Sequence, residues 1–212
     1  MARWTFGVEP LPQSLTIASL VRTVTGLVLS LEAPHAAVER LIAALRSAEA
    51  ELRRLVPANP TPRVGPAAKS DGRVYLDHAR DVGSFNPCFP TYEIRVDGDR
   101  ASGTVAFPIA YEGPPGVLHG GFLAVFFDSI VQHHNCDLGI AGRTTSLAVT
   151  YRRPTPLLRE LHFEVERSVE DRRITSAARL FADGVVLCDA QVSAIAGDRA
   201  QLPEVSARRA GA

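Results

Sequence analysis

The chain has few cysteines and no surplus of either charge. Its 212 residues include three cysteines, Cys88, Cys136 and Cys188, which are odd in number and far apart. They form neither a disulfide framework nor a CxxC metal knuckle, which is typical of a protein in a reducing cytoplasm. The 23 basic and 23 acidic side chains balance. That balance argues against a partner with a broad negative field, either nucleic acid or an anionic membrane.

Long apolar runs are also scarce. The only candidate for a membrane span runs from Leu15 to Leu31, and it contains Arg22 and three threonines. These residues make the run too polar for a spanning helix of about 20 apolar residues. No small-residue cleavage site follows a clean hydrophobic stretch, so a signal peptide is not expected. We therefore expect a cytoplasmic protein with no membrane partner.

What the sequence does contain is a globular composition, with 46% hydrophobic and 22% charged residues. We divide it into a helical extension with a Pro-rich linker at 1–70, a main domain at 71–200 and a flexible tail at 201–212. The extension is expected to be helical over 1–56, and the prolines and glycines of the linker cluster at 57–72. Apolar residues recur at helical spacing in the extension: Val38, Leu41, Ile42, Leu45, Leu52 and Leu55.

The main domain alternates strand signals with one long apolar helix. Two expected strands flank the turn Asp97-Gly98-Asp99, which is a hairpin signal. A turn-rich stretch then leads into a helix expected over 119–135. The two strands at that turn are Tyr92 to Val96 and Ser102 to Phe107, and those expected after the helix are Thr145 to Arg152, Leu161 to Val169, Ile174 to Phe181 and Val185 to Ile195. This order predicts an α+β fold in which an antiparallel sheet wraps around a long central helix.

The central helix carries one conspicuous acid. The stretch around it is apolar on nearly every face, so we expect the helix to be buried nearly all round. Asp128 stands in the middle with no Arg or Lys three or four residues away. Burying an unpaired carboxylate costs several kcal/mol, and such a cost indicates either chemistry or a structural partner elsewhere in the chain.

Gly120 and Gly121 begin the same helix. Their N–H groups are uncovered by side chains and lie where the helix dipole is positive, so they suit a carbonyl oxygen or an oxyanion. Paired glycines equally suit a tight turn or close backbone packing. Gly120 and Asp128 are eight residues apart, or about 12 Å along the axis. One helix therefore does not bring both groups to one substrate, whereas two antiparallel copies across a two-fold axis would.

The stretch Gly116-Val117-Leu118-His119-Gly120-Gly121, an Asp nine residues after the His, and Tyr151-Arg152-Arg153-Pro154 after the next strand together resemble the PaaI-like hot-dog-fold acyl-CoA thioesterases. The resemblance covers about residues 85–196. It implies a hot-dog fold, hydrolysis of acyl-CoA without metal or cofactor, and a homodimer or dimer of dimers. It places Gly120 and Gly121 as carbonyl-binding amides and Asp128 as nucleophile or general base.

This chain departs from the family in one place. Many relatives carry an Asn just before the HGG stretch, where this chain has Tyr111-Glu112-Gly113-Pro114-Pro115. Two other functions stay open. One is a hot-dog hydratase, although the nearest match to its D-x-N-P-x-H loop, Ser84-Phe85-Asn86-Pro87, lacks both the Asp and the His. The other is a non-catalytic acyl-CoA-binding protein.

Several further residues are candidates for the site. His119 is either a catalytic base or a hydrogen-bonding group that orients the loop. Gln132 and Asn135 share a helix face with Asp128 and would orient water or the thioester, or satisfy buried backbone. Thr144 and Thr145 begin the strand beside the helix end, where they either contact substrate or simply favour a strand.

Arg152 and Arg153 are candidates for binding the phosphates of CoA, because a guanidinium group forms bidentate contacts with phosphate oxygens. The alternative is that both lie at a solvated strand edge. His133, His134, Cys136 and Asp137 suggest a metal site at first sight. Adjacent helical residues point about 100° apart, however, and no HxxxH or HExxH spacing exists nearby. We expect no metal there.

Overall fold

The computed structural model describes residues 4–5, 10, 12–55, 73–74, 81–137 and 141–197. The predicted linker at 57–72 and the predicted tail at 201–212 lie outside these residues. Two short strands, β1 (Trp4–Thr5) and β2 (Arg73–Val74), pair in parallel. Within the described ranges, no helix is both long and apolar enough to cross a membrane.

The main domain is built on a six-stranded sheet with the order β3-β4-β6-β7-β8-β5. Every neighbouring pair is antiparallel. Gly98 and Gly184 have φ values of +56° and +75° in the tight turns after β3 and β7, which explains why glycine stands there. The predicted hairpin is confirmed. The strands are β3 (Tyr92–Asp97), β4 (Arg100–Ala106), β5 (Ala141–Tyr151), β6 (Glu160–Glu170), β7 (Arg173–Ala182) and β8 (Val185–Gly197).

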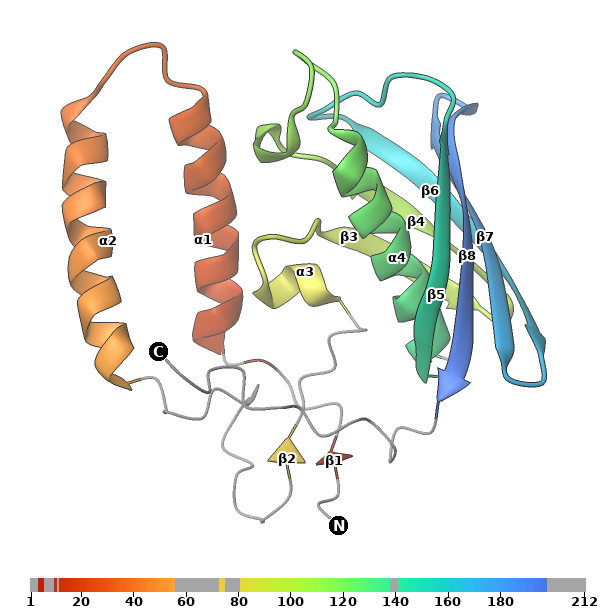
Figure 1. The fold of residues 1–212 in the computed structure, drawn as a ribbon. Coiled ribbons are helices and arrows are strands. Elements are labelled where there is room, and N and C mark those ends of the chain that lie inside the picture. Colours follow the sequence, from red (N-terminus) through yellow and green to blue (C-terminus); the bar gives the residue numbers. More distant parts are fainter. Residues whose placement is uncertain are drawn as a thin grey trace.

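Helix α4 (Gly120–Asp137) lies against the concave face of this sheet, as Figure 1 shows. The chain leaves β4 at one side of the sheet, passes through α4, and returns as β5 at the opposite edge. The predicted α+β hot-dog arrangement, an antiparallel sheet around a central helix, is confirmed.

Aromatic rings fill the space between α4 and the sheet. Phe126 of α4 packs edge to face against Phe107 and Phe163, with ring centroids 5.4 Å apart in both pairs. Tyr92 of β3 also packs edge to face against Phe126 and against Phe163. Edge-to-face pairs of this kind stabilise a core beyond the area that they bury.

The expectation that α4 is buried nearly all round is wrong for one stripe. Gly121, Ala124, Val125, Asp128 and Gln132 keep part of their surface exposed, whereas Phe126, Phe127, Ile130 and Val131 are buried. Gly121, Val125, Asp128 and Gln132 follow one another at steps of four, three and four residues, with Ala124 beside them, so they form one stripe along the helix. Asp128 lies in the middle of that stripe and is half-buried.

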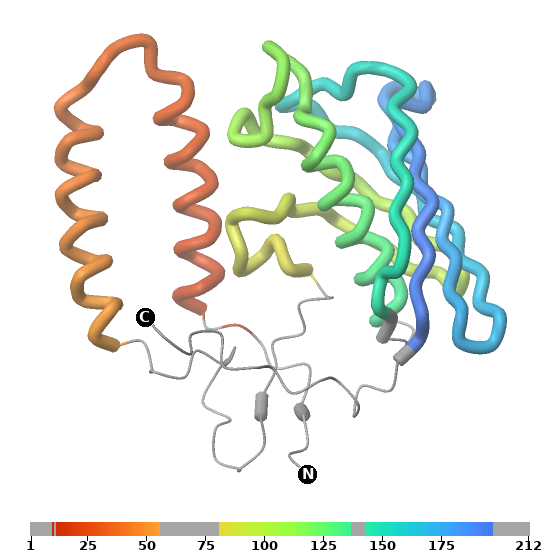
Figure 2. Tube along the Cα trace, viewed as in Figure 1, coloured from red at the N-terminus to blue at the C-terminus, as the bar shows by residue number. Residues whose placement is uncertain are grey.

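The N-terminal extension contains two helices, α1 (Pro12–Leu29) and α2 (Ala36–Leu55). Figure 2 shows them as an antiparallel hairpin beside the main domain. Helix α1 contacts α3 (Val82–Phe85) and the short helix η1 (Ile109–Tyr111), neither of which we predicted. The division at residue 70 stays a prediction.

A single face of α1 makes this contact. Ala18 is fully buried, and a Cβ on Gly26 would lie 3.3 Å from Ile109. The Arg22 guanidinium donates hydrogen bonds to the carbonyl oxygens of Gly83 and Phe89, at 2.5 and 3.4 Å. These contacts attach the hairpin to the main domain.

Candidate active site

The start of α4 is fixed by hydrogen bonds from the preceding loop. The N–H groups of Leu118 and His119 donate to the carbonyl oxygens of Thr155 and Tyr111, both at 2.9 Å. Earlier in the loop, Gly116 has a φ of +75°, and its N–H donates to a carboxylate oxygen of Glu112 at 2.6 Å. The end of the loop is thus bonded both to Tyr111 before it and to Thr155 after β5, and these bonds fix the direction in which α4 begins.

His119 caps the helix. Its Nδ1 accepts a hydrogen bond from the N–H of Gly121 at 3.1 Å, which satisfies one of the amides that lack an intrahelical partner. The imidazole therefore carries no proton on Nδ1 in this arrangement. Among the described residues, the N–H of Gly120 donates to no protein acceptor. Of the two predicted amides, Gly120 supplies the open one.

Tyr151, at the end of β5, covers the same helix terminus from the other side. Its hydroxyl donates to the carbonyl oxygen of Gly120 at 3.0 Å. A Cβ on Gly120 would lie 3.1 Å from three atoms of the Tyr151 side chain, so a larger residue would push the tyrosine away by a few tenths of an ångström. In the sequence, Tyr151 stood out only as part of the Tyr151-Arg152-Arg153-Pro154 stretch, and we predicted no contact for it. The signal was an aromatic residue ending a strand just before Arg152-Arg153-Pro154.

Asp128 is the end of a short hydrogen-bond chain. The Thr144 hydroxyl donates to Asp128 Oδ1 at 2.7 Å, and the Gln132 amide donates to the Thr144 hydroxyl, also at 2.7 Å. Asp128 Oδ2 has no hydrogen-bond partner among the described residues. The arrangement fixes one carboxylate oxygen and leaves the other open, which suits a base or a nucleophile.

A break in the strand register brings Thr144 to the helix. The pairing of β5 with β8 shifts between Thr144 and Ser146, so Thr145 is an extra residue. Thr145 is exposed, and its hydroxyl donates to the carbonyl oxygen of Ser193 at 3.1 Å. Of the two predicted threonines, only Thr144 contacts the acid.

Asn135 does not join this chain of hydrogen bonds. It is fully buried, and its amide oxygen and nitrogen find no partner among the described residues. The neighbouring histidines point to different parts of the fold. His133 contacts the Tyr92 hydroxyl at 3.1 Å, whereas His134 Nε2 donates to the carbonyl oxygen of Gly98 at 2.9 Å. Across the described ranges, no three His, Cys, Asp or Glu side chains gather as metal ligands would.

A groove of about 570 Å³ opens beside the helix terminus. Its wall includes Gly120 and Leu123 from α4 and the segment from Tyr151 to Thr155. Arg152 forms an ion pair with Asp189, so its charge is already used within the chain. Arg153 is exposed and has no ion-pair partner among the described residues. It is the cation at this groove that remains open to an anionic ligand.

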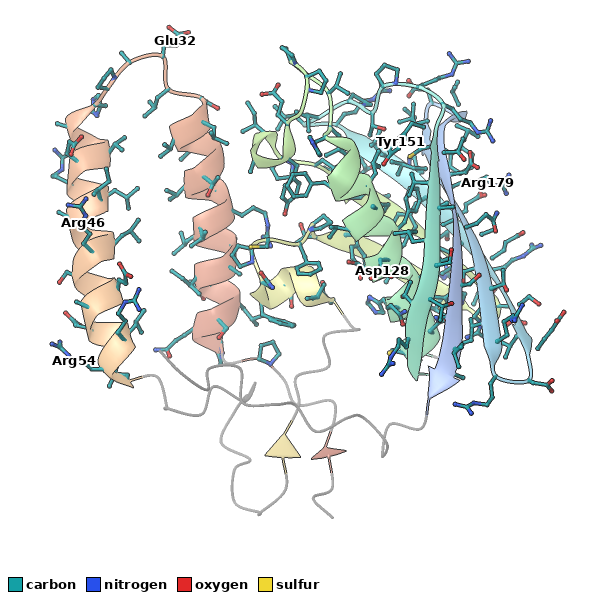
Figure 3. All side chains as sticks on the ribbon, viewed as in Figure 1. Glu32, Arg46, Arg54, Asp128, Tyr151 and Arg179 are labelled. Atoms are coloured by element: carbon teal, nitrogen blue, oxygen red, sulfur yellow. The ribbon has the colours of Figure 1, made fainter. Side chains whose placement is uncertain are left out.

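The two halves of the site are apart within one chain. Figure 3 labels Tyr151 near the start of α4 and Asp128 farther along the helix. The eight-residue separation from Gly120 to Asp128 corresponds to about 12 Å of helix. A reacting carbonyl must lie within about 3–4 Å of both groups. Within a single chain, Gly120 and Asp128 do not meet this requirement.

A second group of titratable residues lies where α1 and α3 meet the main domain. Burial raises the pKa of Asp81, and the nearby His133, Ser84 and Arg22 oppose that rise. Asp81 also has a φ of +42°, in the left-handed region. Desolvation therefore makes the charged form of Asp81 unfavourable in the folded protein.

Solved structures that resemble this chain include one that matches over most of its length. A crystal structure of a thioesterase superfamily protein superposes with a TM-score of 0.70 and 29% sequence identity, covering 90% of this chain and 98% of that chain. No protein-family profile matches the chain. No curated protein sequence matches it either.

Two further crystal structures overlay about half of this chain. One is a hypothetical thioesterase from Streptococcus pneumoniae with coenzyme A, with a TM-score of 0.47 and 21% identity, covering 50% of this chain and 88% of that chain. The other is a Streptococcus mutans protein bound to acetyl-CoA, with a TM-score of 0.49 and 12% identity, covering 51% of this chain and 90% of that chain.

Proposed function

The chain belongs to the hot-dog-fold thioesterase superfamily, and on that premise we propose that it hydrolyses acyl-CoA thioesters to a free acid and CoA. The observation that carries the proposal is the state of Asp128. Its Oδ1 accepts from Thr144, and its Oδ2 is free of protein donors among the described residues. A carboxylate held in this way is oriented to attack a carbonyl or to remove a proton from water.

Gly120 is the proposed binding group for the thioester carbonyl. Its N–H lies at the positive end of α4 and opens beside the groove. As water or Asp128 attacks the carbonyl carbon, negative charge develops on the oxygen, and the N–H stabilises it. The C–S bond then breaks, CoA leaves as the thiolate and takes up a proton, and the acid is released. If Asp128 attacks directly, water hydrolyses the resulting anhydride.

The site is proposed to be shared between two copies of the chain. The separation of about 12 Å between Gly120 and Asp128 along one helix is resolved if each site takes Gly120 from one protomer and Asp128 from the other. The partly exposed stripe of α4, which contains Asp128, would then face the partner. We propose a homodimer or a dimer of dimers on this ground.

The remaining residues have supporting roles in the proposal. Thr144 and Gln132 orient Asp128, whereas His119 and Tyr151 orient the Gly120–Gly121 peptide from its two ends. Arg153 binds a phosphate of CoA, and Arg152 is held by Asp189. His119 thus acts as a helix cap in place of the base that the sequence also allowed. The proposal assigns no substrate contact to Thr145 or Asn135.

A thiol-release assay over acyl-CoAs of graded chain length tests the activity. We expect wild-type protein to release free CoA, and Asp128→Asn to lower kcat by about a thousandfold, within the range that a positioned base contributes. Asp97→Asn, which alters an exposed acid at the end of β3, is the matched control and should keep full activity. Saturable binding without CoA release would indicate a binding protein, and loss of the enoyl absorbance without CoA release would indicate a hydratase.

A complementation experiment tests the shared site. Gly120→Pro removes the proposed donor N–H at the first helical position, where proline is compatible with helix geometry. Gly120→Ala keeps the N–H and, like proline, places a Cβ 3.1 Å from Tyr151, so it is the control for the shift that Tyr151 must make. Mixed dimers of Asp128→Asn and Gly120→Pro chains contain one intact and one doubly altered site. A random mixture should therefore regain about a quarter of wild-type activity, as expected for two equivalent sites on a two-fold axis. A mixture that stays inactive would mean that each site is built within one chain.

A further inference from the structure

The N-terminal hairpin contacts the main domain close to the loop that leads into α4. Helix α1 packs against α3 and η1, and Figure 1 shows it between α2 and the main domain. Ala18 of α1 is fully buried, and Gly26 approaches η1 so closely that a Cβ there would lie 3.3 Å from Ile109. Helix η1 ends at Tyr111, and the chain continues from there into the loop before Gly120. The hairpin is therefore packed against the residues that precede the proposed active site.

Arg22, on the same face of α1, is bonded to the segment that also holds Tyr111. The Arg22 guanidinium donates to the carbonyl oxygens of Gly83 and Phe89. The Tyr111 hydroxyl donates to the carbonyl oxygen of Pro87, in the same segment, at 3.3 Å. Burial raises the pKa of Tyr111, and the adjacent Arg22 guanidinium opposes that rise. Arg22 and the Tyr111 side chain are thus neighbours that are bonded to one segment.

Tyr111 in turn supports the start of α4 in two ways. Its carbonyl oxygen accepts the hydrogen bond from the His119 N–H at 2.9 Å. Its ring packs on Phe122, in the first turn of α4, with the ring centroids 4.3 Å apart. Tyr111 is only 3% exposed, so it moves only if the residues packed around it move. The residues on both sides of Gly120 and Gly121 are therefore held by Tyr111.

The acid of the proposed site is held by other parts of the chain. Thr144 of β5 donates to Asp128, and Gln132 of α4 donates to Thr144. These bonds join α4 to β5, whereas the contacts of Arg22 and Tyr111 lead to the first turn of α4. The two halves of the proposed site thus have separate supports within each chain.

We propose that the N-terminal hairpin sets the position of the Gly120 N–H, with Arg22 as a positioning residue that acts through Tyr111. The inference rests on the proposed thioester hydrolysis, in which this N–H stabilises the negative charge that develops on the carbonyl oxygen. Loosening Tyr111 shifts the donor relative to the carbonyl and leaves Asp128 in place. A misplacement of about 1 Å can cost about a hundredfold in rate, so the hairpin affects kcat from a distance.

Thiol release by Arg22→Met tests this role. We expect kcat to fall about tenfold through misplacement of the donor, with KM unchanged, because an interaction made only in the transition state is weakened. Arg46→Met, on the exposed helix α2 (Figure 3), is the matched control and should keep the wild-type kcat. Tyr111→Phe keeps the ring on Phe122 and removes only the bond to Pro87. It should lower kcat by a smaller factor, and it tests the inference even if Arg22→Met does not fold.

Mixed dimers separate positioning from a general loss of stability. If each site takes Gly120 from one chain and Asp128 from the other, a mixed dimer of Arg22→Met and Asp128→Asn chains has one site in which both groups are intact. A random mixture should therefore reach about a quarter of wild-type activity, whereas the mean of the two parent preparations is about a twentieth. Activity above that mean shows that Arg22 supports the half of the site that contains Gly120.

Two results would overturn the inference. One is a wild-type kcat in both Arg22→Met and Tyr111→Phe. The other is an Asp128→Asn chain that regains activity with Gly120→Pro but not with Arg22→Met. A wild-type protein that releases no CoA would instead overturn the proposed function. The amide proton shift of His119 in NMR spectra then tests the positioning alone: it should change in Arg22→Met and stay constant in Arg46→Met, and equal spectra would contradict the inference.

Discussion

Helices α1 and α4 have the same length, 18 residues, and both are largely apolar: α1 is rich in Leu and Val, and α4 is rich in Phe. They differ in how much of their surface is buried. The sheet covers α4 and buries Leu123, Phe126, Phe127, Ile130 and Val131, whereas α1 buries Ala18 alone. An apolar helix is therefore buried only where the rest of the chain supplies a surface that covers it. In α4 the accessible stripe contains the acid of the proposed site, and in α1 the accessible row contains leucines.

The largest difference should come from truncating one apolar residue on each helix. Phe126→Ala removes a ring that packs against Phe107 and Phe163, and we expect it to lower the free energy of unfolding by about 3–5 kcal/mol. Leu20→Ala on α1, measured in dilute protein where copies do not associate, should stay within about 0.5 kcal/mol. Denaturant unfolding of the main domain checks both values. Similar losses would mean that α1 is part of the core.

Releasing α1 from the main domain should have the next largest effect. Arg22→Met removes the donor to the Gly83 and Phe89 carbonyl oxygens, and a hydrogen bond to a charged group contributes about 1.5–3 kcal/mol. Amide exchange should become faster throughout α1 and stay unchanged in α4. The control is Arg46→Met on the exposed helix α2. Protection of α1 that survives Arg22→Met would place its attachment in the apolar contacts of Ala18 and Gly26.

The role of Asp128 on α4 can be tested by removing the hydroxyl that orients it. Thr144→Val keeps the shape of the side chain and removes the donor to Asp128 Oδ1. We expect kcat for thioester hydrolysis to fall about tenfold, which corresponds to about 1.4 kcal/mol, with little change in KM. Thr145→Val, whose hydroxyl bonds only the carbonyl oxygen of Ser193, is the neighbouring control. Equal losses in the two variants would mean that the strand, not the hydroxyl, is responsible.

The smallest expected effect concerns the contact between α1 and the main domain. Burial raises the pKa of Asp81 above its ordinary value of 3.8, so the folded protein binds this proton more tightly than the unfolded chain does. Stability is therefore lost as pH rises from about 3.8 through the raised pKa. Asp81→Asn should raise the Tm slightly at neutral pH and flatten its decline over that window. Asn also tolerates the left-handed backbone.

Asp171→Asn is the matched control for this last prediction. Asp171 has a φ of +53° but lies exposed in the turn between β6 and β7. Its substitution should leave the pH dependence of the Tm as in wild type. If the two variants behave alike, the burial of Asp81 contributes nothing to the pH dependence.

The sequence predicted those parts of the fold that depend on neighbours along the chain. The turns at Gly98 and Gly184 and the start of α4 near Gly120 follow from local residue types, so they were found within a few positions. The short helices α3 and η1 lacked such signals. Arg22 was noted only as too polar for a membrane span. Its partners at Gly83 and Phe89 lie 61 and 67 residues away, and no local pattern encodes them.

The same limit applies to the candidate site. Asp128 and the glycine pair could be recognised because burial costs and helix termini act locally. The bond from Thr144 depends on a register shift between β5 and β8, and the ion pair of Arg152 with Asp189 joins residues 37 apart. Tyr151 was missed for the same reason, because its contact with Gly120 spans 31 residues.

The contact between Gly120 and Tyr151 also restricts which sequences this fold accepts. A methyl group at position 120 would lie 3.1 Å from the ring atoms and the hydroxyl of Tyr151, so a side chain there requires the tyrosine to shift by a few tenths of an ångström. A smaller residue at position 151 would free the space but remove the donor to the Gly120 carbonyl oxygen. The two positions are therefore expected to vary together among relatives of this protein, as a pair 31 residues apart.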